Sequence, residues 1–125
     1  MKQRMSRAVQ VLVAVPSARV ARRISEGLLE KRLCACAQTL GPVTSQYRWK
    51  GRLESAREWL LLIKTRASLS TTVVSEIRRL HPYEVPEILV LPVSGGHGPY
   101  LDWLRRETAS TPRARSKGRV RRRVL

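Results

Sequence analysis

The feature that most constrains the fold is a long pair of apolar segments on either side of Lys50–Gly51. Upstream lie Ala35–Leu40 and Val43–Trp49, interrupted by Gly41–Pro42, and downstream lies Leu53–Thr65. The Lys50–Gly51 pair is typical of a tight hairpin turn between two strands. A two-stranded arm of this length cannot bury both of its faces inside one small domain, and isolated hairpins are marginally stable in water. We therefore expect the arm to find a partner surface.

The chain begins with a strand and a helix. Ala8–Val15 alternates valines with a second, largely apolar set, as in a central strand covered on both faces. Pro16–Ser17 ends this strand, and Ser17 is a plausible N-cap for a helix that runs through Leu33. Its inner stripe has helical spacing and consists of Val20, Ile24, Leu28 and either Leu29 or Leu33.

The second half of the chain repeats this order of elements. Ser68 or Ser70 can cap a second helix, and His81–Pro86 is a rigid, non-helical connection because each of its prolines disfavours helix in the preceding residue. The inner stripe of the second helix is Leu69, Val73, Ile77 and Leu80. Ile88–Val93 is predicted to be another two-faced strand, and Tyr100–Glu107 a short final helix.

These elements predict an α+β protein with the ferredoxin-like βαββαβ arrangement, an extended β-hairpin and a C-terminal helix. Right-handed crossovers place the two main helices on one face of an antiparallel sheet. The other face is then largely apolar and uncovered. We expect another subunit to cover it.

The chain of 125 residues fits one domain, which we place at residues 8–108 after a basic extension at 1–7. No run of about 18 apolar residues is present, so no membrane span is expected, and the short apolar run after Arg7 is interpreted as a strand rather than a signal peptide.

Cys34 and Cys36 are too close in sequence for an unstrained bridge, and we interpret them as small buried side chains. Free cysteines fit a reducing compartment, here the cytoplasm.

The net charge of +16 is unevenly spread, and the tail at residues 109–125 is the most basic part of the chain. The tail contains seven basic residues and no acidic ones, which leaves 18 basic and 9 acidic residues in the rest of the chain. The basic residues are Arg113, Arg115, Lys117, Arg119, Arg121, Arg122 and Arg123. Such a segment is expected to be disordered, and to be either a solubilising appendage or a weak, nonspecific nucleic-acid contact.

No nucleophile–base pattern and no phosphate-binding loop is visible, so we do not expect an enzyme. The sequence does resemble the CutA divalent-cation tolerance family over about Val9–Arg106. The matching motifs, in order, are Glu30–Ala37, Thr44–Gly51, Ile63–Thr65, His81–Glu87, Leu91–Val93 and Pro99–Trp103. The resemblance implies a homotrimer of ferredoxin-like subunits, with ligand clefts between subunits as in the PII signalling proteins, and a role in tolerance of copper and other divalent cations. A non-catalytic scaffold or partner-docking trimer remains an alternative.

The resemblance also implies a copper site made by a cysteine at the end of the first strand and by histidine before the Pro-Tyr motif. Here the cysteine position corresponds to Val13, which cannot bind a metal, and only His81 carries over. The nearby carboxylates Glu84 and Glu87 could add oxygen ligands, with Glu84 preferred, and a site of one histidine and one carboxylate would bind divalent ions weakly. The alternative is that His81 bonds backbone carbonyls at the helix end. His97 is expected to be an exposed loop residue.

A second set of candidates, from the strongest motifs, could together line a cleft between subunits with aromatic walls and a few polar groups. They are Tyr47, Trp49, Lys64, Tyr83, Glu84 and Glu87. The alternative interpretation is that the aromatic residues pack in an interface and that Lys64 forms a structural ion pair with Glu84 or Glu87.

Overall fold

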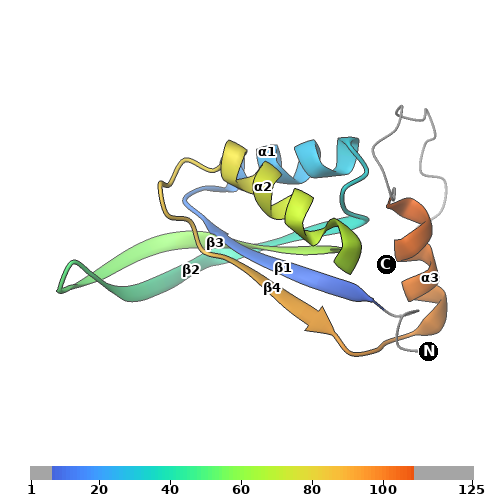
Figure 1. Ribbon diagram of the computed structural model, residues 1–125. Helices are drawn as coiled ribbons and strands as arrows, with labels where there is room; N and C mark the ends of the chain where they lie inside the picture. Colours follow the sequence, from blue (N-terminus) through green and yellow to red (C-terminus); the bar gives the residue numbers. More distant parts are fainter. Residues whose placement is uncertain (1–6, 109–125) are drawn as a thin grey trace.

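The computed structural model describes residues 7–108 and has two layers, with two helices covering one face of a four-stranded sheet (Figure 1). The elements are β1 (Ala8–Val15), α1 (Ala18–Glu30), β2 (Cys36–Trp49), β3 (Arg52–Arg66), a single 3-10 turn (Ala67–Leu69), α2 (Ser70–Leu80), β4 (Ile88–Val93) and α3 (Gly98–Glu107). The basic tail and, apart from Arg7, the predicted N-terminal extension lie outside the described residues.

The sheet has the order β2-β3-β1-β4, and every neighbouring pair is antiparallel. This is the predicted ferredoxin-like topology, with β1 in a central position. The β2–β3 hairpin projects well beyond the end of the sheet, while α3 lies at the opposite end of the molecule (Figure 1). The extended hairpin and the C-terminal helix are thus both confirmed.

The hydrophobic core lies between the sheet and helices α1 and α2. One side of β1 supplies four buried valines, which pair in register with residues of β3 such as Leu61 and Ile63. The buried stripe of α1 includes Ile24 and Leu28, and that of α2 includes Val73 and Ile77. The helical spacing seen in the sequence therefore identified the core-facing side of both helices.

Two details of the helices differ from expectation. The first helix ends at Glu30 rather than Leu33, because Arg32 adopts a left-handed conformation with φ 56°. Neither Ser68 nor Ser70 caps α2, which begins from the 3-10 turn with no side-chain cap. The N-cap of α1 is confirmed, since the Ser17 hydroxyl accepts a hydrogen bond from the Val20 amide at 3.1 Å.

The hairpin closes at the predicted turn. Lys50 and Gly51 both have positive φ, 52° and 78°, which matches the twist that tight two-residue hairpins prefer. Lower in the hairpin, the pairing of β2 with β3 shifts register between Leu40 and Val43. Gly41 lies at this shift, close to Trp59. A Cβ atom at Gly41 would lie 2.8 Å from Trp59 Cδ1. A side chain cannot fit there.

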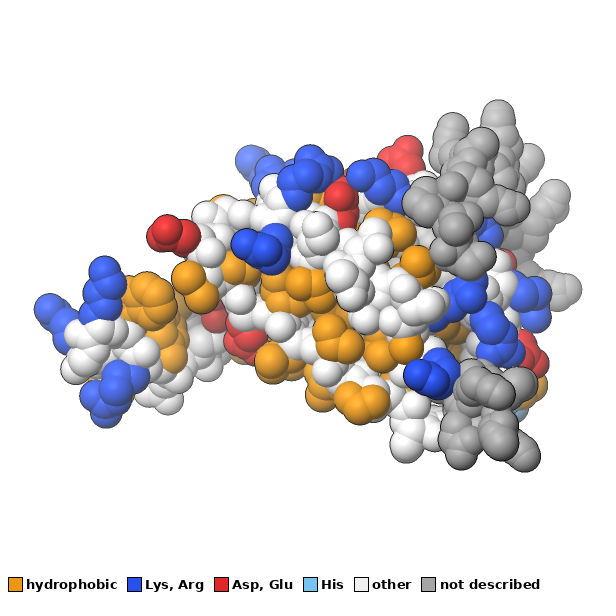
Figure 2. All heavy atoms as spheres, in the orientation of Figure 1, with side chains coloured by type: hydrophobic (Ala, Val, Ile, Leu, Met, Phe, Trp, Pro, Cys, Tyr) orange, Lys and Arg blue, Asp and Glu red, His pale blue; other side chains and the backbone are white. Residues whose placement is uncertain are grey.

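The sheet face opposite α1 and α2 carries a row of leucines. Leu12 of β1 pairs with Leu62 of β3 on one side and with Leu89 of β4 on the other. Alternation along the strands directs these side chains away from the two helices, and Leu89 is 50% exposed. Figure 2 shows hydrophobic side chains gathered over the middle and lower part of the molecule, below the helical layer. Much of the sheet's second face therefore stays uncovered within one chain.

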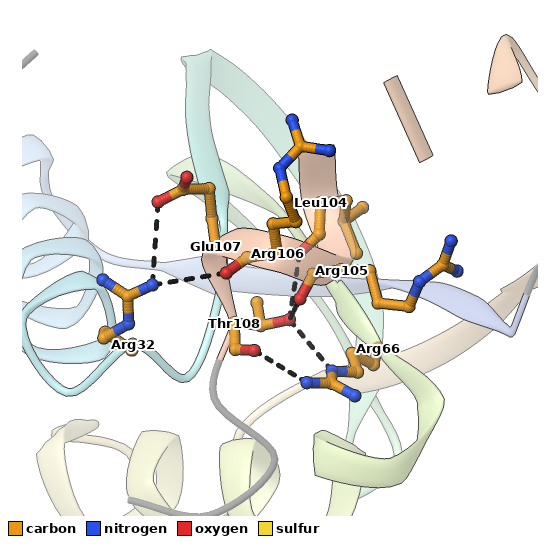
Figure 3. A network of polar contacts seen from close by, with 7 residues as sticks. All are labelled: Arg32, Arg66, Leu104, Arg105, Arg106, Glu107 and Thr108. Atoms are coloured by element: carbon orange, nitrogen blue, oxygen red, sulfur yellow. Dashed lines mark hydrogen bonds and ion pairs between the residues drawn. The ribbon is translucent and has the colours of Figure 1, made fainter. Parts of the chain in front are cut away.

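Helix α3 contacts β3 and is held at its C-terminus by two arginines (Figure 3). Arg66 donates to the hydroxyl and the carbonyl oxygen of Thr108 at 3.0 and 2.7 Å. Arg32 donates to the Arg106 carbonyl at 3.3 Å and lies 3.8 Å from the Glu107 carboxylate. Positive charge suits this end of a helix, where carbonyl oxygens lack intrahelical partners.

Candidate functional site

His81 lies at the end of α2 and is buried against the end of β1. Its Nε2 donates to the Ala14 carbonyl oxygen at 2.7 Å, and its Nδ1 accepts from the Tyr83 amide at 3.1 Å. His81 is 7% exposed, and both of its ring nitrogens have backbone partners. His81 thus ties the 81–87 segment to β1, and binding of a metal ion would require one of these hydrogen bonds to break.

Tyr83 connects the same segment to the hairpin. Its ring contacts that of His81, with centroids 4.8 Å apart, and its hydroxyl donates to Glu58 Oε2 at 3.1 Å. The pKa of Tyr83 is raised, mainly because burial removes solvent from the phenol. The hydrogen bond to Glu58 and the negative charge of that carboxylate raise it further. The phenol therefore stays a neutral donor to a buried acid.

A hollow of about 700 Å³ opens where these elements meet, at the base of the projecting hairpin. Its wall comes from the end of β1, from β2, from β3 and from the segment between α2 and β4. The lining residues are Ala14, Ser45, Gln46, Tyr47, Trp49, Glu58, Pro82, Tyr83, Glu84, Val85 and Glu87. A hollow of this size fits the usual volume of small-molecule sites.

Five of the six residues predicted to line a cleft between subunits line this hollow within one chain. Lys64 does not: it pairs in register with Gln10 and Cys36, and its ammonium group donates to Gln38. The ion pair considered between Lys64 and Glu84 or Glu87 is absent among the salt bridges of the described residues.

The predicted metal ligands are not arranged as a dedicated metal centre within one chain. Glu84 lines the hollow, whereas His81 lies behind it with both nitrogens engaged. Within residues 7–108, no three His, Cys, Asp or Glu side chains lie close enough to hold one ion. Val13, at the family's cysteine position, is fully buried in the core beside Leu61. The residues of a single chain therefore do not fit a resident metal ion.

The remaining sulfur and histidine side chains lie apart from the hollow. Cys34 and Cys36 are free and buried, as predicted, and burial raises the pKa of the Cys34 thiol to about 12, so the thiol stays protonated. His97 is exposed immediately before α3, also as predicted.

Sequence reasoning missed Glu58. It lies in the return strand of the hairpin, pairs in register with Val43 just past the shift at Gly41, and is 8% exposed. The only signal for it was the Gly41–Pro42 interruption, since such irregularities often turn a side chain toward a site.

An α+β subunit of ferredoxin-like topology, with a projecting hairpin and an aromatic, acidic hollow at its base, defines the structural class of this protein. Residues 9–107 match the family model described as "CutA1 divalent ion tolerance protein". The chain belongs to this family.

No helix within the described residues is long and apolar enough to cross a membrane.

Named relatives agree with this assignment. The divalent-cation tolerance protein CutA of Thermus thermophilus is 46% identical over 98 residues, which cover 78% of this chain and 95% of that protein. Human protein CutA is 44% identical over 98 residues, and the match spans only 55% of its length.

Solved structures agree on the fold. A Thermus thermophilus Cut A1 structure superposes with TM-score 0.80 at 44% identity, covering 82% of this chain and 99% of that one. The structure of CutA from Xylella fastidiosa gives TM-score 0.81 at 36% identity, covering 83% of this chain and 100% of the other.

Proposed function

We propose that this chain is a non-catalytic, cytoplasmic binding protein that acts as a homotrimer in divalent-cation tolerance, with the hollow at the hairpin base as its ligand site. The observation that carries the proposal is the hollow itself, which gathers three aromatic and three carboxylate side chains in a member of a family named for this tolerance. The two free, buried cysteines support a reducing location.

The uncovered sheet face supports the homotrimer. Leu12, Leu62 and Leu89 form a continuous apolar row, and Leu40 and Leu91 are 55% and 40% exposed. Contiguous apolar surface on a sheet is characteristic of an interaction site, and burying it against copies of the same chain removes it from water. The projecting hairpin offers further surface for the same purpose.

Native mass spectrometry of the purified chain tests the assembly. We expect a trimer, and we expect Leu62→Glu to dissociate it, because a carboxylate would then be buried in an apolar interface. Leu29→Glu is the matched control, since Leu29 is 41% exposed on α1 and outside this face. A stable monomer at low concentration would overturn the proposal.

The role in cation tolerance does not depend, in this proposal, on direct metal binding by His81 and Glu84. Calorimetric titration with Cu²⁺ and Zn²⁺ should therefore give the same isotherm for the natural chain and for His81→Gln, whose amide can still donate toward Ala14. His97→Gln is the control for loss of an exposed imidazole. A binding event lost in His81→Gln and kept in His97→Gln would instead identify His81 as a metal ligand.

A second candidate function, nucleic-acid association, is favoured by the charge of the chain. The segment 111–125 holds seven basic residues and no acid. Removing it should abolish retention of the protein on RNA at low salt, because phosphate contacts of this kind are electrostatic. Retention that survives the deletion would exclude the tail as the cause.

A further inference from the structure

The charge of the hollow is opposite to that of the chain. The protein has 25 basic and 9 acidic residues, yet three of the nine acids, Glu58, Glu84 and Glu87, line this one hollow. None of the described residues that line it is Lys, Arg or His. On a strongly basic surface, such a concentration of carboxylates creates a local site for a positive charge.

The walls of the hollow are aromatic as well as acidic. Tyr47, Trp49 and Tyr83 line it, which is half of the six tyrosines and tryptophans in the chain. Within one chain these residues are 44%, 50% and 39% exposed, so their rings are not covered by side chains of the same subunit. Aromatic faces attract cations, most strongly ammonium and guanidinium groups that have left bulk water.

Glu58 supplies the buried part of the site. The residue is only 8% exposed, and within residues 7–108 its carboxylate accepts a hydrogen bond from the Tyr83 hydroxyl at 3.1 Å. A carboxylate has about four acceptor positions, so capacity remains for N–H donors of a ligand. Guanidinium and ammonium groups satisfy such oxygens with short, charge-assisted hydrogen bonds.

The arrangement favours an organic cation over a metal ion. Glu58 lies on β3 whereas Glu84 and Glu87 lie on the segment between α2 and β4, and among the described residues no three metal-ligating side chains are close enough to hold one ion. A hollow of about 700 Å³ is far larger than one ion needs, and its aromatic walls offer no metal ligands.

We infer that the hollow binds a small organic cation carrying a guanidinium or primary ammonium group, held by the carboxylates and packed against the aromatic rings. This inference rests on the proposed function, in which the same hollow is the ligand site, and it adds the chemical class of the ligand. Glu58 binds the cationic head beside the Tyr83 ring, Trp49 lines the part of the hollow nearer the hairpin turn, and the exposed Glu84 and Glu87 attract the ligand to the opening.

The test is a titration of the full chain with two isosteric probes, N-acetylarginine amide and the uncharged N-acetylcitrulline amide. The readout is the indole N–H NMR signal of Trp49, assigned with Trp49→Phe. We expect the arginine probe to shift this signal and to bind at least about tenfold more tightly than the citrulline probe, because charge-assisted hydrogen bonds exceed neutral ones by this factor.

Matched variants locate the effect. Glu58→Gln keeps an acceptor for Tyr83 but loses the charge, so it should weaken the arginine probe about tenfold or more. The double variant Glu84→Gln/Glu87→Gln, at exposed positions that tolerate the change, should weaken it several-fold and safeguards the test if Glu58→Gln fails to fold. Glu26→Gln, an exposed acid on α1, should leave the affinity unchanged.

Two outcomes overturn the inference, and a third overturns the proposed function on which it rests. Equal binding of both probes would leave a ligand site that does not select cations. If the Trp49 signal responds to neither probe while the protein is still trimeric, binding of an organic cation in the hollow is excluded, but the proposed trimer is retained. A monomeric protein would remove the proposed function itself, whichever probe binds.

Discussion

The hydroxyl of Tyr83 donates to the carboxylate of Glu58 at 3.1 Å, although the two residues are 25 positions apart in the sequence. This contact joins the segment after α2 to the hairpin strand β3, and it forms part of the wall of the hollow. Its two ends differ in exposure: Glu58 is buried, whereas Tyr83 is 39% exposed. The bond therefore anchors a surface ring to a buried acid.

Tyr83→Phe should lower the free energy of unfolding by about 1 kcal/mol, because it removes one hydrogen bond and leaves a buried carboxylate without that donor. Urea unfolding of the two proteins measures the difference. Tyr47→Phe is the control. It removes a phenol hydroxyl from the same hollow, but this hydroxyl makes no hydrogen bond to any of the described residues. An equal loss in both variants would mean that the Glu58 contact contributes nothing specific.

Acid should weaken the contact between α1 and α2. Hydrogen bonds from Arg79 and Lys31 lower the pKa of Glu76 from its ordinary value of 4.5 to about 2. A carboxyl group with a lowered pKa in the folded state stabilises the protein above its unfolded pKa, and this contribution is lost as pH falls from 4.5 to about 2.

The size of this acid effect is limited, because the side chains of Lys31 and Arg79 are 52% and 61% exposed. Ion pairs of this kind contribute no more than about 1 kcal/mol. The midpoint of urea unfolding, followed over the same pH window, should fall less in Glu76→Gln than in the natural chain. Parallel pH curves for the two proteins would contradict the prediction.

Gly41→Ala should destabilise the base of the hairpin. The new methyl would lie 2.8 Å from Trp59 Cδ1, and φ at this position is +155°. Overpacking of this kind costs about 1–3 kcal/mol. Thermal unfolding measures the loss, with Gly95→Ala as control because nothing lies within 4 Å of a Cβ there. The prediction fails if the two alanine variants unfold alike.

Arg66→Met should loosen the end of α3. It removes the hydrogen bonds to the Thr108 hydroxyl and carbonyl oxygen, at 3.0 and 2.7 Å, while keeping the apolar stem of the side chain. Amide hydrogen exchange should become faster in the last turn of α3, by about tenfold for a loss of about 1.4 kcal/mol. Arg106→Met, on the exposed side of the same helix, should leave exchange there unchanged. Equal protection in both variants would exclude Arg66 as the anchor of α3.

Most of the fold was predictable because it depends on short-range periodicity. The alternation of Val9, Val11 and Val13 identified the central strand, and the spacing of Ile24 and Leu28 identified the buried side of α1. The Lys50–Gly51 pair identified the turn, because only a few residue types tolerate positive φ. Five residues taken from the motifs shared with the family also line the hollow, whereas Glu58 lies outside those motifs.

Contacts between distant segments were decided only by the tertiary structure. His81 reaches Ala14 across 67 positions, and Tyr83 reaches Glu58 across 25. No local pattern encodes either pair, because a hydrogen bond between elements depends on how a sheet and its helices pack. For the same reason the sequence left open whether Lys64 lines a cleft or forms an ion pair with Glu84 or Glu87, and its ammonium group instead donates a hydrogen bond to Gln38. The sequence by itself determined which residues face the core, because buried apolar residues recur with the period of the helix or strand. Only the tertiary structure decided which polar side chains form hydrogen bonds with one another, because those contacts depend on distance in space.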